Sequence, residues 1–452
     1  MVKHAIIFAA VFLAASCARI AAQDTVTIDP DKTYQTIDGW EFTTRVWEMD
    51  KPNNAYSGEW LNRRDQIVDG LVNQIGYNRI RMEVRSGFEN PVDYWRQFVA
   101  GDITYEEVKS HFYEKINDND DPNVLNEDGI QWSCLDYYVE NLLIPMRAKL
   151  EERGERLHVV LNYVDFKRPP LASDLSHSQN PEEYAELIAA AFDHLKSKYD
   201  ITPDAFEVIL EPDNTLDWTG ERIAAGLVAV DERLSQQGVR PLYIAPSTAH
   251  ASRAPKYFDE IVRNRQAADL LDVLSYHRYD WKRASAAIPK IVSRARAHDL
   301  DTAMLEFVQG KPWQLVEDLT QGQVVAWQKF GVPYRPIPPG EPELQPIPHI
   351  LALAEVFTNV RRGAVRIGAG SSSKQTRPMA FRNKDGSYAI FVYRDAPGDV
   401  VFANVPAGSY VLTMANAEKV VNLGPQEVQT GEAFTINLPS PGLVTLRQRL
   451  PG

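Results

Sequence analysis

The sequence predicts a (β/α)8 TIM barrel followed by a smaller, appended antiparallel β-sandwich domain. Short apolar runs alternate with amphipathic helical stretches up to residue 370, which is the pattern of a parallel sheet covered by helices. Eight such runs match the eight strands of a closed barrel. After residue 370 the helical periodicity ends, and short strands rich in β-branched and aromatic residues follow one another between turns.

The length and composition of the chain suit two globular domains of unequal size. The chain has 452 residues, of which 44% are hydrophobic and 24% are charged, so it can bury a large core. Its formal net charge of -13 argues against nucleic acid and anionic membrane surfaces as partners. A neutral substrate is compatible with this charge.

Residues 1–23 are expected to form a secretory signal peptide. Lys3 and His4 precede an apolar run at 5–15 that is too short to span a membrane, and small residues follow it. The run ends in a permissive lipoprotein motif, so a lipid anchor at Cys17 is an alternative to simple cleavage. Either route predicts a secreted, periplasmic or cell-surface protein.

The sequence shows no signal for a structural disulfide, a metal site or a cofactor. Only Cys17 and Cys134 occur, and Cys134 has no partner if Cys17 is removed or lipidated. No HExxH, CxxC or His-rich cluster is present. The acidic run at 117–121 lacks the glycine of a calcium loop and is interpreted as a solvated turn. We therefore expect neither a metal nor a cofactor.

The barrel is assigned to residues 36–370, with strands expected near residues 37, 80, 159, 208, 243, 273, 304 and 365. Helical sequence follows each strand except the last, and 315–329 is one of these predicted helices. The long acidic and aromatic segment at 87–128 follows the second strand, and loops of this size are usually functional. An open doubly wound sheet is the alternative. It would need a glycine-rich turn after the first strand, where Gly39 stands alone.

The β-sandwich is assigned to residues 371–452, where Asp385-Gly386 and Ala407-Gly408 mark turns between strands. Residues 24–35 alternate apolar and polar positions, and we expect this N-terminal segment to add one or two strands to the sandwich. We interpret the sandwich as an accessory domain packed on the barrel, with carbohydrate binding as the alternative.

Two predicted barrel strands, the fourth and the seventh, end on a glutamate. Val208, Ile209 and Leu210 form an apolar run that stops at Glu211, and the seventh run stops at Glu306. Side chains at the carboxyl ends of barrel strands gather at one face, where barrel enzymes place their catalytic residues. Two glutamates at this face can together cleave a glycosidic bond, because one can donate a proton while the other attacks or stabilises the anomeric carbon.

At these residues the chain resembles the (β/α)8 glycoside hydrolases of clan A, which are retaining enzymes. Glu211-Pro212 is similar to the motif after strand four, and Glu306-Phe307 is similar to the motif after strand seven. The resemblance implies that Glu211 is the acid/base and that Glu306 is the nucleophile.

Two further motifs extend the resemblance. The segment 76–81 is similar to the strand-two motif, and its Arg81 would steady the nucleophile. The segment 277–279 resembles the His-x-Tyr motif of strand six, with His277 beside the site and Tyr279 in contact with the nucleophile. Within the clan, residues 35–39 and the predicted domain order are most similar to glycoside hydrolase family 30.

Leu210 departs from the pattern of the clan, which normally has an asparagine there that bonds the sugar 2-hydroxyl. Losing this contact would remove several kcal/mol of transition-state stabilisation unless another group replaces it. Asn162, Asn214 and His250 are candidates for the replacement. Otherwise the alternative function is a non-catalytic carbohydrate-binding protein on a degenerate glycosidase barrel.

Three tryptophans near predicted strand ends, Trp40, Trp281 and Trp313, are candidates to stack on sugar rings. Together with the glutamate pair and the signal peptide, the resemblance to clan A implies a secreted glycosidase that cleaves β-glycosidic bonds in a polysaccharide or oligosaccharide by double displacement.

Overall fold

The computed structural model describes residues 24–46, 55–166, 175–215, 217–335 and 343–450. The predicted signal peptide and Cys17 lie outside these residues. Within the described ranges, no helix has both the length and the apolar character needed to cross a membrane.

Eight parallel strands close into a barrel, in which each strand pairs with the next and the last pairs with the first. They are β2 (Gly39–Thr43), β3 (Arg79–Arg85), β4 (His158–Val164), β5 (Ala205–Glu207), β6 (Leu242–Thr248), β7 (Leu271–His277), β8 (Asp301–Glu306) and β9 (Val324–Gln328). Small and branched side chains fill the barrel interior, among them Val160, Ile244, Ala303 and Leu305. The barrel predicted from the sequence is therefore confirmed.

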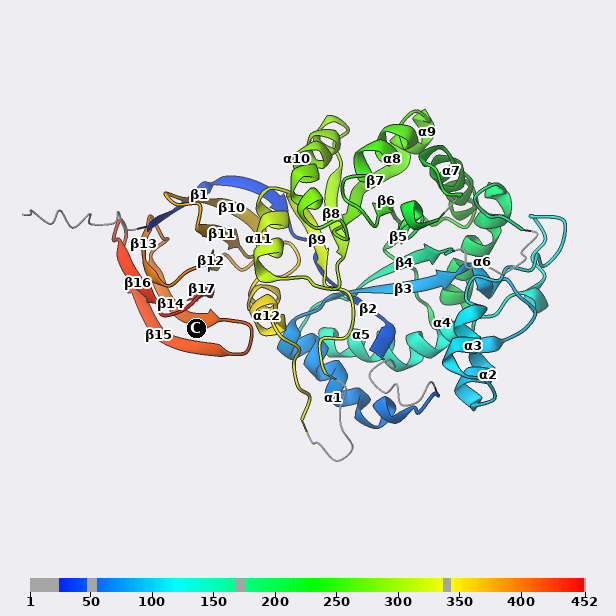
Figure 1. Ribbon diagram of the computed structural model, residues 1–452, viewed down its shortest axis with the longest axis horizontal. Coiled ribbons are helices and arrows are strands. Elements are labelled where there is room, and N and C mark those ends of the chain that lie inside the picture. The colour runs from blue at the N-terminus through cyan, green and yellow to red at the C-terminus, as the bar shows by residue number, and fades with distance from the viewer. Residues whose placement is uncertain (1–23, 47–54, 167–174, 216, 336–342, 451–452) are drawn as a thin grey trace, which may run out of the picture.

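Helices surround the barrel and bury their apolar faces against its outer surface (Figure 1). They are α1 (Arg64–Asp69), α2 (Tyr94–Ala100), α3 (Tyr105–Ser110), α4 (Ser133–Tyr138), α5 (Ile144–Glu151), α6 (Pro181–Tyr199), α7 (Gly220–Gln236), α8 (Ala254–Ile261), α9 (Arg265–Leu270), α10 (Lys282–Ala297), α11 (Pro312–Thr320) and α12 (Ile350–Asn359). Local sequence sets several of their starts. Thr219 accepts a hydrogen bond from the backbone of α7, and Pro181 occupies the first position of α6.

The prediction of the eighth barrel strand is wrong. The stretch at 315–329, expected to be helical, contains the end of α11 and then β9, which closes the barrel against β2. The segment expected as strand eight is β10 (Val365–Ser371), and it pairs with β1 (Asp24–Thr36) and β11 (Thr376–Arg382) in the other sheet. The expected barrel range of 36–370 therefore extends too far, because its last strand belongs to the sandwich.

The second domain is one nine-stranded sheet in the order β15-β14-β17-β12-β11-β10-β1-β13-β16. Its remaining strands are β12 (Tyr388–Arg394), β13 (Gly398–Ala403), β14 (Gly408–Ala415), β15 (Val420–Val428), β16 (Phe434–Leu438) and β17 (Gly442–Arg449). Neighbouring strands are antiparallel except β1 and β13, which are parallel. Figure 1 shows β1, the first strand of the chain, lying inside this C-terminal sheet, as the sequence predicts.

The sheet packs against the barrel through α11 and α12. Met379, Phe381, Phe391 and Leu443 of the sheet belong to the same apolar cluster as the barrel helices. A separate apolar core, with Val400, Phe402 and Tyr410 among its members, fills the sandwich itself. The two domains therefore share an apolar interface.

Candidate active site

Glu211 lies just beyond β5, on backbone that neighbouring strands hold in place. Leu210 N donates to Tyr163 O at 2.9 Å and Glu211 N donates to Ser247 O at 3.0 Å, which fixes the segment between β4 and β6. Glu211 adopts a left-handed conformation with φ of 49°, and Pro212 follows it directly. This conformation is costly for a residue with a side chain, and such outliers cluster at functional sites.

Glu306 is the last residue of β8, and two donors hold its carboxylate. Arg81 of β3 donates from Nη2 to Oε2 at 2.5 Å, and the Tyr279 hydroxyl donates to Oε1 at 2.9 Å. Arg81 also donates to the carbonyl oxygen of Leu305 at 3.2 Å, which fixes its guanidinium on β8. Both oxygens of Glu306 are therefore oriented by hydrogen bonds.

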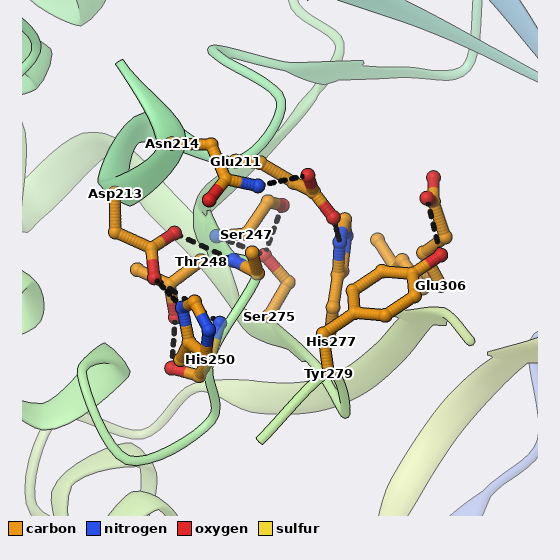
Figure 2. A network of polar contacts seen from close by, with 12 residues as sticks. Glu211, Asp213, Asn214, Ser247, Thr248, His250, Ser275, His277, Tyr279 and Glu306 are labelled. Carbon is orange, nitrogen blue, oxygen red and sulfur yellow. Dashed lines mark hydrogen bonds and ion pairs between the residues drawn. The ribbon is translucent and has the colours of Figure 1, made fainter. Parts of the chain in front are cut away.

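A different pair of donors holds Glu211. His277 Nδ1 lies 3.0 Å from Oε1, and Asn214 Nδ2 donates to Oε2 at 2.6 Å. One carboxylate oxygen of Glu211, one of Glu306 and one ring nitrogen of His277 all lie within 4.8 Å of one another. Figure 2 shows the two glutamates on either side of His277 and Tyr279. The structure thus brings together the five motif residues Arg81, Glu211, His277, Tyr279 and Glu306.

The structure adds Glu207, which the sequence reasoning missed. Its side chain is fully buried in β5, 3.6 Å from Arg81 Nη1 and 3.8 Å from His277 Nε2. Burial raises the pKa of Glu207, but the charges of Arg81 and His277 outweigh burial and hold the pKa below its usual value. The only available signal was an acid inside an apolar strand, next to Phe206 and Val208.

The charges of the site favour a cationic histidine. Burial disfavours that charge, yet Glu207 and Glu211 raise the pKa of His277 to about 9. Burial raises the pKa of Glu306, Arg81 opposes this shift, and the repulsion from Glu211 adds to it. Two cations, Arg81 and His277, thus face three carboxylates.

The expectation that Trp40 stacks on a sugar is wrong. Trp40 lies on β2 with none of its side chain exposed, and its ring stacks on Phe357 of α12 at 4.7 Å between centroids. Its indole nitrogen donates to Val360 O at 2.7 Å. Trp40 therefore belongs to the core between the barrel and α12.

The other two tryptophans lie in different surroundings. Trp281 is 56% exposed and meets Phe307 edge-on, with 5.8 Å between the ring centroids. Because Phe307 directly follows Glu306, Trp281 offers an apolar surface close to the glutamate pair. Trp313 is half-buried on α11, and the guanidinium of Arg278 lies 5.7 Å from its ring centroid.

The three polar candidates to replace the missing asparagine have different partners. Asn214 bonds Glu211, and His250 Nδ1 bonds Asp213 at 2.7 Å (Figure 2). Asn162 is fully buried on β4 beside Glu207, and neither atom of its amide has a hydrogen-bond partner among the described residues. Leu210 is 5% exposed and packs in the barrel's apolar cluster. Asn162 is thus the candidate with unused hydrogen-bonding capacity.

Neither a protein-family model nor a curated protein matches the sequence. Solved structures do match the fold. The catalytic domain of a GH30 xylanase C from Talaromyces cellulolyticus has a TM-score of 0.65 at 14% identity, covering 94% of this chain and 100% of that chain. A GH30 endoxylanase from Clostridium papyrosolvens has a TM-score of 0.64 at 16% identity with the same coverage.

An endo-β1,6-glucanase matches with a TM-score of 0.61 at 15% identity, covering 94% of this chain and 93% of that chain. All three likenesses extend over nearly the whole of both chains and include the barrel and the appended sheet. The chain therefore has the fold of these glycoside hydrolases, as the resemblance in its motifs implies.

Proposed function

We propose that the protein is a retaining glycosidase that cleaves β-glycosidic bonds in a polysaccharide or oligosaccharide. The observation that carries the proposal is the pair of buried glutamates, with oxygens within 4.8 Å of each other at the carboxyl ends of two barrel strands. Retaining enzymes place their carboxyl groups about 5–5.5 Å apart, whereas inverting enzymes need about 6.5–9.5 Å to admit a water. The short separation favours double displacement.

The contacts of the two glutamates support different roles. Glu306 accepts from the permanently charged Arg81, which opposes the rise in the pKa of Glu306 caused by burial and by Glu211, and an ionised carboxylate suits a nucleophile. Glu211 accepts from His277 and Asn214 and has no direct contact with an arginine among the described residues, and it follows the fourth barrel strand as the acid/base of clan A does. Glu211 is therefore the acid/base and Glu306 the nucleophile.

The reaction then proceeds in two steps. In the first step Glu306 attacks the anomeric carbon while Glu211 gives its proton to the leaving glycosidic oxygen, which produces a glycosyl-enzyme. In the second step Glu211 removes a proton from water as that water attacks the anomeric carbon, and Glu306 leaves. Each step inverts the anomeric carbon, so the product keeps the configuration of the substrate.

The substrate class follows from the site and from the similar folds. The structures compared are named as xylanases and an endo-glucanase, and we infer a β-linked polysaccharide or oligosaccharide for this chain as well. Exposed Trp281 would stack on a sugar ring close to Glu306. Export through residues 1–23, by cleavage or with a lipid at Cys17, would place the protein where such substrates occur.

Azide rescue tests the mechanism and the two roles together. With an activated β-glycoside, Glu306→Gly and Glu211→Ala should each lower turnover by about 10³-fold or more. Azide should restore turnover and give the α-glycosyl azide with Glu306→Gly and the β-glycosyl azide with Glu211→Ala. Glu221→Ala, at an exposed glutamate of α7, is the control and should form no azide adduct. The reverse pairing of products would overturn the assigned roles.

A second candidate function is carbohydrate binding without turnover, and Leu210 in place of asparagine is the observation that favours it. Calorimetry with β-linked oligosaccharides, followed by product analysis after long incubation, separates the two functions. Binding without product in both the wild-type chain and Glu306→Gly would support a binding protein. Product formation that Glu306→Gly abolishes would exclude it.

A further inference from the structure

A second group of carboxylates gathers away from the active site, where the long segment after β3 meets the start of α6. One oxygen each from Glu89, Asp118 and Glu183 lies within 4.8 Å of the others. Glu186 is buried one turn further along α6. Three separate chain segments thus supply acidic oxygens to one place.

Several oxygens of this cluster have unused hydrogen-bonding capacity. Glu89 is 2% exposed, and its Oε2 lies 2.6 Å from His177 Nε2. Its Oε1 is buried and has no hydrogen-bond partner within the described part of the chain. The same holds, over the same residues, for Asp118 Oδ1, Glu183 Oε2 and the side-chain oxygen of Asn117. A buried polar oxygen without a hydrogen-bond donor is energetically costly, so we expect these four oxygens to bind a ligand.

The surrounding cations do not balance the cluster. His177 contacts Glu89 at 2.6 Å, and Arg233 of α7 lies at the same end of α6. Arg233 itself donates to Pro122 O at 2.7 Å and pairs with Glu182 at 3.6 Å, outside the cluster. Among the described residues, His177 is thus the one basic side chain paired with the three clustered carboxylates.

We propose that Glu89, Asp118 and Glu183 form a calcium site, with Asn117 as an additional oxygen ligand. All the available ligand atoms are oxygens, which hard divalent cations prefer. Calcium binds oxygens at about 2.3–2.6 Å, so ligands on opposite sides of the ion lie up to about 5 Å apart, and oxygens that all lie within 4.8 Å of one another can reach one ion. Magnesium requires a near-ideal octahedron at about 2.0–2.1 Å and keeps several of its waters, whereas ligands from three chain segments suit the more flexible coordination of calcium. The acidic run at 117–121 lacks the glycine of an EF-hand loop. This absence excludes only an EF-hand, because the proposed ligands come from three separate chain segments.

Bound calcium would tie the acidic segment at 117–121 to α6 and to the barrel. Glu89 reaches the barrel through His177, whose Nδ1 lies 2.6 Å from the hydroxyl of Tyr163 on β4. The neighbouring residue Asn162 lies beside Glu207 of the catalytic site. The ion would therefore fix the segment that follows β3 without touching the catalytic groups. This inference does not rest on the proposed glycosidase activity.

Calcium binding to the full chain is the direct test. After chelation and desalting, calorimetry with CaCl2 should show one site with a Kd at or below about 1 mM, and calcium should raise Tm. Glu183→Gln and Asp118→Asn should each weaken binding at least about tenfold and remove most of the Tm shift. Asp120→Asn removes a charge from the same acidic run at an exposed position outside the cluster and should bind as the wild type does.

Two results would overturn the proposal. One is a wild-type chain that shows neither binding heat nor a Tm shift with CaCl2. The other is an Asp120→Asn variant that loses as much affinity as Glu183→Gln, which would indicate general charge attraction. Equal affinity for MgCl2 and CaCl2 would overturn the choice of calcium. Circular dichroism of each variant in chelator establishes that it is folded, and none of these measurements uses a sugar substrate.

Discussion

At the scale of single residues, one histidine links the catalytic pair to a buried carboxylate. His277 contacts Glu211 through Nδ1 at 3.0 Å and faces Glu207 through Nε2 at 3.8 Å. Burial opposes a rise in the pKa of His277, yet the negative charges of both acids raise it and so favour a cationic ring with a proton on each nitrogen. Glu207 is therefore a positioning residue, since it stabilises the charge that orients Glu211.

The raised pKa of His277 predicts a pH dependence of stability. The pKa rises from an unfolded value of about 6.5 to about 9 in the folded chain, although burial alone would lower it. Protonated His277 therefore contributes stability that is fully present below about pH 6.5 and is lost as pH rises through 9. His277→Gln should remove up to about 3 kcal/mol of this dependence.

Urea unfolding of the wild-type chain and of His277→Gln, at pH values from about 6 to about 10, measures this prediction. The range spans the pKa of His277 in the unfolded and in the folded chain. The difference between their unfolding free energies should shrink as pH rises. A difference that stays constant across the range would contradict a cationic His277. Comparing the two chains at each pH cancels the titration of all groups that they share.

Trp281 gives a prediction about substrate binding. Trp281→Ala should raise KM for oligosaccharides about tenfold, equivalent to about 1.4 kcal/mol, with little change in kcat, because in the proposed function the ring would touch the sugar but not the reacting atoms. Its side chain is 56% exposed, so Tm should change little. Val308→Ala, at a nearby position that is 48% exposed, is the control and should keep the wild-type KM. An unchanged KM in Trp281→Ala would remove this residue from the binding surface.

The sequence predicted those site residues that belong to motifs at strand ends, since barrel geometry brings such ends to one face. It could not identify the contact from Asn214, which depends on how the chain turns after β5, where Glu211 takes a φ of 49°. It missed Glu207 because only the register of β5 decides whether an acid within the strand points into the barrel or away from it. The expectation that Trp40 stacks on a sugar is wrong because the sequence does not show which face of its strand the side chain occupies. Successive side chains of a strand point to opposite faces, and Trp40 points to α12 rather than to the site.

At the scale of elements, a buried carboxylate on α11 joins three parts of the barrel. Asp318 accepts from the hydroxyl of Tyr276 on β7 at 2.8 Å and from Trp327 of β9 at 2.9 Å. It also pairs with Arg278 at 2.6 Å, and Arg278 is the residue between His277 and Tyr279. Asp318 thus holds the segment that presents two residues of the candidate site.

Replacing this carboxylate should destabilise the whole barrel. Asp318→Ala leaves the buried Arg278 with Glu317 as its remaining carboxylate. It also leaves Tyr276 and Trp327 without their acceptor, and breaking such a buried network typically costs about 3–5 kcal/mol. Urea unfolding measures this loss. Asp259→Ala removes the partner of Arg294 in a pair whose side chains are 48% and 30% exposed, and this control should cost less than about 1 kcal/mol. Equal losses in the two variants would contradict the role given to Asp318.

The same region explains the error in the predicted eighth strand. β9 is only five residues long, and its sequence Val324–Gln328 continues the apolar spacing of α11. Short apolar runs fit a buried strand and a buried helix equally well, so periodicity does not separate them. Tertiary pairing with β8 and β2 decides in favour of the strand. The apolar run near 365 matched a barrel strand as well, but its partner is β1, which comes from the other end of the chain.

At the scale of the whole molecule, the apolar interface between barrel and sheet predicts that both domains unfold together. Phe391 of β12 is fully buried and lies in the cluster that contains α11 and α12 rather than in the core of the sandwich. Phe391→Ala should therefore weaken the junction itself, at a cost of about 3–5 kcal/mol. A chain of this size loses roughly 2 °C of Tm per kcal/mol, so Tm should fall by about 5–10 °C.

Scanning calorimetry, with the loss of glycosidase activity or sugar binding followed over the same temperatures, measures this coupling. The wild-type chain should give one transition that coincides with the loss of function, and Phe391→Ala should shift both to the same extent. Phe402→Ala provides the comparison, because Phe402 lies in the separate core of the sandwich. If the domains are coupled, this variant also lowers the temperature at which the barrel loses function. If Phe402→Ala instead splits off an early transition and leaves barrel function unchanged, the sandwich folds independently and the shared interface does not couple the domains.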